Sequence, residues 1–257
     1  MITRRYMLAT LSLLAIPHFR KSLAENPQTS IPNVTDKPKT DARNPEMVSK
    51  DGNLSYLKND SVDFKKLLPA PALIDSDETK MELEMLLHIQ GARTAAEVAA
   101  AESMGKLTVD AFAGTFGEWF KAGELPQTVA LIKKVEKDSK FYTGAAKDFY
   151  KRLRPAHDTR IKPSLAGDDE PSYPSGHATR GLLFALVLSE LDPSKKDALL
   201  DRGRNIGWSR CVAGVHYPSD LIAGRVLAQA MFHSMSNHPK FVEAVAAAKA
   251  EITKARK

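Results

Sequence analysis

Pro171-Ser-Tyr-Pro-Ser-Gly-His177 is followed at once by an apolar run, residues 178–191. We expect Ser175 to cap a helix that begins here, and Gly176 to let the backbone come close to a ligand. The first N–H groups of such a helix point outward, which predicts a seat for phosphate. His177 falls in the first turn, where an imidazole can protonate an oxygen that leaves a bound phosphoryl group. Alone, the pattern is more typical of an ordinary capped helix, so two flanking clusters decide its meaning.

The cluster that precedes this junction is basic: Lys147-Asp-Phe-Tyr-Lys-Arg-Leu-Arg154-Pro155. Lys147 and Arg154 are two helical turns apart, so we expect both on one face near the end of a helix that Pro155 terminates. Two fixed cations there can clamp a phosphate dianion, the arginine as a bidentate fork and the lysine as a point charge. Taken alone, the cluster favours a solvated basic face, because Lys151 and Arg152 lie between them.

The cluster that follows the junction is Ser209-Arg210-Cys-Val-Ala-Gly-Val-His216-Tyr-Pro-Ser-Asp220. We expect Arg210 just after a helix, and His216 just before a second helix that starts at Pro218. Asp220 then lies in the first turn and can reach back to the His216 ring. A carboxylate on one imidazole nitrogen fixes the tautomer and leaves the other nitrogen with a free lone pair. Such a histidine can act as a nucleophile.

Together the three clusters read Lys-x6-Arg-Pro, Pro-Ser-Gly-His and Ser-Arg-x5-His-x3-Asp. This pattern resembles the tripartite signature of the superfamily that includes type 2 phosphatidic acid phosphatases, bacterial class A non-specific acid phosphatases and vanadium haloperoxidases. The motif covers residues 147–220. An extended, proline-stiffened segment at residues 56–71, together with Tyr173 before Pro-Ser-Gly-His, resembles the class A enzymes in particular. Ala70 departs from it, because those enzymes tend to have an unbroken proline run there.

The resemblance implies a role for each matching residue. His216 attacks phosphorus and forms a phosphohistidine, Asp220 orients it, and His177 protonates the leaving oxygen and then activates water. The remaining positions bind the equatorial phosphate oxygens, whose charge fixed cations and N–H groups stabilise: Lys147, Arg154, Ser175, Gly176 and Arg210. No further histidine or carboxylate falls at ligand spacing, so we expect neither a metal nor a cofactor.

From residue 76 onward the sequence reads as helical almost throughout. Apolar residues recur at helical spacing, prolines mark helix starts, and no alternating strand pattern extends beyond a few residues. With 43% hydrophobic residues the chain can build one sizeable core, so we predict an all-α fold. It forms a single compact helical domain of the phosphatidic acid phosphatase and haloperoxidase type over residues 55–257. The expected helices span residues 77–90, 94–105, 107–120, 126–137, 141–153, 178–191, 193–208, 218–235 and 241–255.

Residues 1–24 have the organisation of an export signal, with Arg4-Arg5, a short apolar stretch and small residues before a cleavage position. The segment is too short to remain as a membrane anchor, and both the general secretory and the twin-arginine routes stay open. Residues 25–54, rich in Asn, Pro and Thr, are expected to form a flexible leader. We therefore expect a periplasmic or secreted protein.

Charge and cysteine content limit the partners. Of the 37 lysines and arginines, four fall in the signal, which leaves 33 against 31 acidic residues. That balance indicates no general polyanion surface and hence no nucleic-acid partner. Cys211 is the only cysteine, which excludes an internal disulfide. The expected substrates are small-molecule phosphate monoesters, and a homo-oligomer is compatible with the sequence.

The leading interpretation is an acid phosphatase that hydrolyses phosphate monoesters through a phosphohistidine. A lipid phosphate or pyrophosphate phosphatase is one alternative, weakened by the lack of segments of transmembrane length. A vanadate-dependent haloperoxidase, with His216 as the vanadium ligand, is a second, for which the chain is short. A non-catalytic phosphate-binding module is a third, but it leaves His177 and the His216/Asp220 pair without a role.

Overall fold

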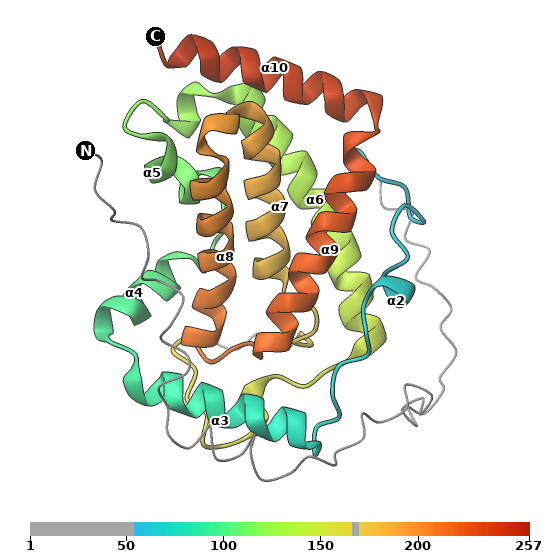
Figure 1. Cartoon of the computed structure of the whole chain (residues 1–257), viewed down its shortest axis with the longest axis vertical. Helices are drawn as coiled ribbons and strands as arrows, with labels where there is room; N and C mark the ends of the chain where they lie inside the picture. Colours follow the sequence, from blue (N-terminus) through green and yellow to red (C-terminus); the bar gives the residue numbers. More distant parts are fainter. Residues whose placement is uncertain (1–53, 166–169) are drawn as a thin grey trace, which may run out of the picture. The chain divides into compact units, whose positions relative to one another are not determined.

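The computed structural model describes residues 54–165 and 170–257, and this part of the chain is helical, with no strand. The all-α prediction is therefore confirmed. The predicted signal peptide, and all but the last residue of the predicted leader, lie outside the described residues. The helices (Figure 1) are α2 Phe64–Leu67, α3 Asp77–Ala92, α4 Ala95–Ser103, α5 Ala113–Phe116, α6 Pro126–Tyr150, α7 Gly176–Leu191, α8 Lys196–Val212, α9 Pro218–Ser236 and α10 Pro239–Ala255.

Helix α7 is the central element of the described residues, in contact with α6, α8, α9 and α10 (Figure 1). Most of its residues are buried, which explains why its sequence is apolar on every side rather than along one stripe. Leu183, Phe184 and Leu188 are fully buried and belong to the main core. The N-terminus of α7, where the phosphate seat is predicted, therefore rests on the most firmly packed helix of the structure.

Glycines allow α7 to lie very close to α8 and α9. A Cβ added to Gly203 of α8 would lie 2.5 Å from the carbonyl oxygen of Gly181 in α7. A Cβ added to Gly224 of α9 would lie 2.7 Å from the carbonyl oxygen of Ser175. Real Cβ atoms do not come this close to a backbone oxygen, so this packing depends on glycine at both positions. The second contact sets the first half of α9 directly against the start of α7.

The segment before α3, predicted from the sequence to be extended, packs against the helical body and contains one helical turn, α2. Its start is held by Asp138 of α6, whose carboxylate accepts the N–H groups of Ser55, Tyr56 and Leu57 at 2.7, 2.8 and 3.1 Å. Near its end, the Oη of Tyr150 donates to the carbonyl of Leu68 at 2.9 Å. Buried carboxylates and hydroxyls with such partners satisfy backbone groups that no helix supplies.

Helix α6 differs from the prediction at both its middle and its end. It is one helix of 25 residues, Pro126–Tyr150, where two were expected. It ends because Lys151 adopts the left-handed conformation, with φ 49° and ψ 32°. Arg154 consequently lies on an extended segment, with φ −72° and ψ 155°. The prediction that Lys147 and Arg154 share one helix face is therefore wrong, because the helix stops four residues before the arginine.

The stretch predicted as a helix over residues 107–120 is broken into short turns. A 3₁₀ turn, Val109–Phe112, is followed by α5, which ends at Gly117 with φ 111°. A glycine in this region of φ terminates a helix readily. The apolar residues of the stretch are still buried, so the spacing identified core residues but not a continuous helix. They include Phe112, Phe116 and Phe120.

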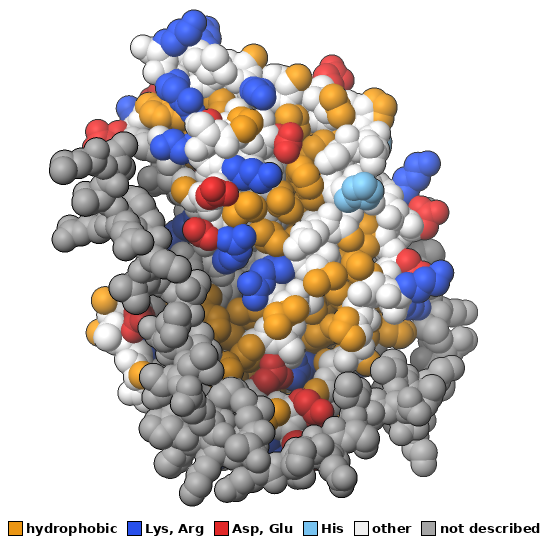
Figure 2. All heavy atoms as spheres, in the orientation of Figure 1, with side chains coloured by type: hydrophobic (Ala, Val, Ile, Leu, Met, Phe, Trp, Pro, Cys, Tyr) orange, Lys and Arg blue, Asp and Glu red, His pale blue; other side chains and the backbone are white. Residues whose placement is uncertain are grey.

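None of the described helices is both long and apolar enough to cross a membrane. On the face shown in Figure 2, hydrophobic side chains are exposed between charged ones. Trp208 of α8 and Ile222 of α9 are exposed to 45% and 57%, so α8 and α9 both present apolar surface outside the core.

Candidate active site

Residues from all three clusters line one cavity of about 300 Å³. Arg154 comes from the segment after α6, His177 from the first turn of α7, Arg210 from α8, and His216 from the turn between α8 and α9. Backbone and apolar side chains form the remainder of its wall: Gly105, Ala156, Pro163, Leu165, Gly214 and Val215. The fold thus brings together residues that are far apart in the chain, such as Arg154 and His216, which are separated by 62 positions.

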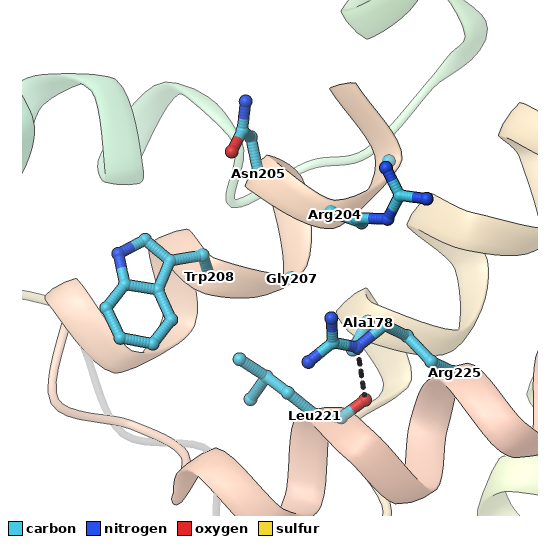
Figure 3. A pocket seen from close by; sticks show the side chains of 8 residues that line it. Ala178, Arg204, Asn205, Gly207, Trp208, Leu221 and Arg225 are labelled. Atoms are coloured by element: carbon cyan, nitrogen blue, oxygen red, sulfur yellow. Dashed lines mark hydrogen bonds between the residues drawn. The ribbon is translucent and has the colours of Figure 1, made fainter. Parts of the chain in front are cut away.

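A smaller cavity of about 110 Å³ lies at α8 and α9 (Figure 3). Arg204, Trp208, Leu221 and Arg225 contribute to its wall, and the predicted site residues do not. Arg225 donates through Nε to the carbonyl of Leu221 at 3.3 Å, and Arg204 pairs with Asp201. Both arginines are engaged within their own helices, and no nucleophile lies between them. The predicted site residues that line a cavity line the larger one.

His216 and Asp220 form the pair that the sequence predicts. The Nδ1 atom of His216 lies 3.1 Å from Oδ2 of Asp220, and both side chains are buried. Because the carboxylate accepts, Nδ1 carries the proton, and Nε2 keeps its lone pair. Nη1 of Arg154 lies 3.0 Å from that Nε2 and donates to it. The nitrogen available for attack is thus adjacent to one of the predicted phosphate-binding cations.

The start of α9 explains this geometry. Pro218 occupies the first helical position, and Asp220 is the third residue of the helix. Its Oδ2 also accepts the backbone N–H of Tyr217 at 2.9 Å, so one carboxylate both caps the helix and holds the histidine. The carbonyl of Asp220 accepts the N–H of Ser175 at 3.0 Å. This bond joins the start of α9, which holds His216, to the N-terminus of α7, where the phosphate seat is predicted.

His177 lies in the first turn of α7, whose N-cap is Ser175, as predicted. Ser175 Oγ accepts the N–H of Ala178 at 3.3 Å. Nε2 of His177 lies 2.9 Å from the carbonyl oxygen of Gly105, so this nitrogen carries the proton and Nδ1 is left for the reaction. Burial, then the charges of Arg180 and Arg210, lower the pKa of His177 to about 3. The imidazole is therefore neutral at neutral pH.

Lys147 and Arg154 meet at Glu170, although they do not share a helix face. Nζ of Lys147 lies 2.8 Å from Oε2 of Glu170, and Nε of Arg154 donates to the Glu170 carbonyl at 2.9 Å. Nη1 of Arg154 also donates to the carbonyl of Val215 at 2.9 Å. The Glu170 carboxylate binds the Lys147 ammonium in the same way that a phosphate oxygen would.

Arg210 lies in the last turn of α8, not after it as expected. It is buried, and its guanidinium donates to the carbonyl of Ala101 and, from Nε at 3.1 Å, to Ser209 Oγ. Ser175 and Gly176 sit at the N-terminus of α7 but do not line the cavity. Their contacts with phosphate, like those of the three cations, stay predictions.

Opposing effects determine the pKa values of His216 and Asp220. Burial lowers the pKa of His216 to about 4, aided by Arg154 and Lys147, whereas Asp220 acts in the opposite direction. Burial alone would raise the pKa of Asp220, but the hydrogen bond from His216 and the nearby Arg152 hold it below its ordinary value. Asp220 is thus an anion and His216 a neutral imidazole at neutral pH.

Arg152 is the principal residue that the sequence interpretation missed. It was assigned to a solvated basic face, yet its side chain is 3% exposed and its Nη1 lies 2.7 Å from Oδ1 of Asp220. Glu82 and Gly105 were also missed, because each contacts the site from a distant part of the chain. Glu170, directly before Pro171, was missed as well. Only the position of Arg152 beside Arg154 could have drawn attention to it.

Among residues 54–165 and 170–257, no three histidine, cysteine or acidic side chains are placed to hold a metal ion. Cys211 is buried beside the site, and burial raises the pKa of its thiol. Its Sγ contacts the carbonyl of His216 at 3.5 Å. It is a core residue rather than a reactive thiolate.

Comparison with known proteins identifies the class. Residues 137–241 match the PAP2 superfamily. The non-specific acid phosphatase of Providencia stuartii is 32% identical over 218 residues, which cover 80% of this chain and 87% of that protein. The chain therefore belongs to the PAP2 superfamily, in the family of the bacterial non-specific acid phosphatases.

Two further similarities agree with this placement. The non-specific acid phosphatase of Salmonella typhimurium is 33% identical over 147 residues, 55% of this chain and 59% of that protein. Among solved structures, a bacterial vanadium-dependent iodoperoxidase is similar with a TM-score of 0.53 at 16% identity, covering 69% of this chain and 53% of that one. At that identity the likeness shows the fold alone.

Proposed function

We propose that this protein is an exported acid phosphatase that hydrolyses small phosphate monoesters through a phosphohistidine at His216. The enzyme class predicted from the sequence, a phosphoric monoester hydrolase, agrees with the names that the relatives carry. Periplasmic or secreted location rests on the export signal at residues 1–24. The small, largely apolar wall of the cavity outside the charged residues favours small esters.

The observation that carries the proposal is the arrangement of His216. Its Nδ1 is held by a buried carboxylate, and its Nε2 lies beside the guanidinium of Arg154 in a cavity that also contains Arg210. Phosphate binding alone needs cations and N–H donors. A neutral imidazole with a fixed tautomer is needed only if its free nitrogen attacks.

In the first step the Nε2 lone pair attacks phosphorus, and the bond from phosphorus to the ester oxygen breaks. Arg154 stops donating to Nε2 and binds a phosphoryl oxygen instead, together with Lys147 and Arg210. A proton from His177 passes to the departing oxygen, which leaves as an alcohol. The positive charge that forms on the His216 ring is balanced by Asp220.

In the second step water attacks the same phosphorus atom. His177, now neutral, takes a proton from this water, and the N–P bond breaks to return the electron pair to Nε2 of His216. Inorganic phosphate leaves the site. The oxygen charge that develops in both steps is stabilised by positioned cations, which act strongly where water is excluded.

The lowered pKa of His216 fits catalysis in mild acid. With a pKa of about 4, His216 is neutral above that pH and keeps the lone pair it needs. His177 must be protonated to act as an acid, although burial and the nearby arginines lower its pKa to about 3, so the negative charge of the bound phosphoryl group has to raise it. We expect kcat/KM to fall below about pH 4, where His216 of the free enzyme becomes protonated. Undiminished kcat/KM at pH 3 would contradict this assignment.

The proposal is tested by hydrolysis of p-nitrophenyl phosphate with the purified mature protein. We expect turnover that is unchanged by a chelator and strongly inhibited by vanadate, which mimics the five-coordinate transition state. Activity that is lost on dialysis against chelator and restored by a divalent ion would reject the metal-independent mechanism. Absence of any turnover, with phosphate still bound, would favour a binding protein.

A further inference from the structure

We propose that Arg152 and Glu82 are positioning residues of the phosphatase: Arg152 holds Asp220 in place behind His216, and Glu82 balances the charge of Arg152. This inference rests on the proposed function, since it assigns both residues to the orientation of the nucleophile. Neither residue lines the cavity, so neither is placed to touch the substrate.

The two oxygens of Asp220 have separate partners. Oδ2 accepts from His216 Nδ1 at 3.1 Å and from the Tyr217 N–H at 2.9 Å. Oδ1 accepts from Nη1 of Arg152 at 2.7 Å. A carboxylate fixed at both oxygens cannot rotate, so the imidazole bonded to it is fixed as well.

The end of α6 explains why Arg152 points inward. Lys151 takes the left-handed conformation that ends the helix, and the chain then turns so that the Arg152 carbonyl accepts the N–H of Ser172 at 2.8 Å. The guanidinium lies 3.9 Å from the centre of the Tyr217 ring. Its side chain is 3% exposed, whereas a position on a solvated helix face would leave it in water.

Glu82 of α3 completes the arrangement. Its Oε2 lies 2.8 Å from Nη2 of Arg152, and its Oε1 accepts the N–H of Ser219 at 2.7 Å. Nη1 of Arg152 also donates to Ser219 Oγ at 2.7 Å. Glu82 therefore binds both the arginine and the first turn of α9, and it joins α3 to the helix that carries Asp220.

The charges indicate why a second acid is needed. Arg152 alone would cancel the charge of Asp220, and the positive ring that forms during attack would lose its counter-ion. With Glu82 included, the set of Glu82, Arg152 and Asp220 carries one net negative charge; Glu82 itself is partly buried. Phosphorylation of His216 places one positive charge beside it, so the site is balanced when the intermediate forms.

The experiment compares Arg152→Gln and Glu82→Gln in the full mature enzyme by single-turnover phosphorylation. We expect each to slow phosphorylation roughly 10- to 100-fold, the range typical of residues that orient catalytic groups. Inhibition by inorganic phosphate should change by less than about 3-fold, because the cavity lining is intact. The matched control is the pair Arg160 and Glu84, which also connects the segment after α6 to α3, at 2.9 Å, but is exposed. Arg160→Gln and Glu84→Gln should leave phosphorylation unchanged.

The pH profile separates positioning from a merely structural role. Among the described residues, His216 is faced by Asp220 from α9, Lys147 from α6, Arg154, and more distantly His177 from α7. Arg152→Gln removes a cation behind Asp220, so the acid limb of kcat/KM should move to higher pH. Glu82→Gln removes an anion and should move it to lower pH. Shifts in the same direction, or none, would overturn the inference.

Failure of this inference is distinguishable from failure of the proposed function. If His216→Ala still forms the covalent intermediate, the phosphohistidine proposal fails. If His216 is the nucleophile but both glutamine variants phosphorylate within about 3-fold of wild type, the positioning role fails. Should Arg152→Gln not fold, Glu82→Gln, which keeps the same side-chain shape, decides by its rate and the direction of its pH shift.

Discussion

The two histidines of the proposed active site, His216 and His177, lie in differently built surroundings. His216 is held by the buried carboxylate of Asp220, which is bonded to buried Arg152, and Arg152 in turn pairs with the partly buried Glu82. His177 is held at Nε2 by one backbone carbonyl, that of Gly105, in the segment after α4. The proposed nucleophile, His216, is thus oriented by charged side chains that mutation can remove one at a time. The proposed acid, His177, is oriented by a backbone carbonyl, which mutation can only shift.

The largest expected effect is at the nucleophile. His216→Ala should lower turnover on the order of 10⁶-fold, because the covalent route is lost. Wild-type enzyme mixed rapidly with substrate and denatured in alkali should carry a phosphoryl group that survives alkali and is released by acid. The alanine variant should lack it, and equal labelling of the two proteins would place the nucleophile elsewhere.

Asp220→Asn is next. An amide disturbs the tautomer of His216 and withdraws the charge that balances the phosphorylated ring, so we expect a loss of about 10³- to 10⁴-fold in kcat. The variant should also unfold at a lower temperature, because buried Arg152 loses one of its two anionic partners. Thermal melts and steady-state rates measure the two losses separately. A kcat within 10-fold of wild type would remove Asp220 from the mechanism.

The third-largest effect is expected for His177→Ala, which removes the proposed general acid. Alkyl phosphates need a proton on the departing oxygen, and we expect them to lose about 10²- to 10⁴-fold in the phosphorylation step. p-Nitrophenolate departs without that proton, so aryl phosphates should lose distinctly less. The comparison uses kcat/KM or the single-turnover burst, since steady-state turnover includes the second step. Equal losses for both esters would indicate that His177 binds phosphate rather than donating a proton.

The smallest effect is expected at the carbonyl that holds His177. A Cβ at Gly105 would lie 3.1 Å from the Glu102 carbonyl oxygen, so Gly105→Ala must shift the local backbone by a few tenths of an ångström. We expect about a 2- to 5-fold loss for alkyl phosphates and less for aryl ones. Gly123→Ala, where nothing lies within 4 Å of the added atom, is the matched control. An equal loss with both esters would show that the shift reaches His216 as well.

Local patterns predicted much of the site. His216, Pro218 and Asp220 are close in the chain, and a helix start forces four-residue neighbours together, so their bond could be inferred from spacing. The helix cap formed by Ser175 could be inferred in the same way, because it bonds to a residue only three positions later. Arg154 was misplaced because a single left-handed residue, Lys151, ends α6 early, and nothing in a lysine indicates that conformation.

The long-range partners could not have been predicted. Glu82 contacts Arg152 across 70 residues, and Gly105 contacts His177 across 72. Such pairs are set by how α3 and α4 pack against α8 and the end of α6, which periodicity within one helix does not specify. The burial of Arg152 has the same origin, because a basic residue among other basic residues resembles a solvated surface until its partners are known.

The close contact between Gly224 and the carbonyl of Ser175 has a consequence for how the enzyme tolerates change. The distance between α9 and the N-terminus of α7 is set there by contact between backbone atoms. It therefore does not depend on the size or rotamer of any core side chain. Substitutions deep in the core can lower the melting temperature while the surviving folded molecules keep normal catalytic constants. Gly224→Ala should have the opposite effect. It should leave most of the core unchanged but move His216 and Asp220 away from the N-terminus of α7, and so lower the catalytic constants.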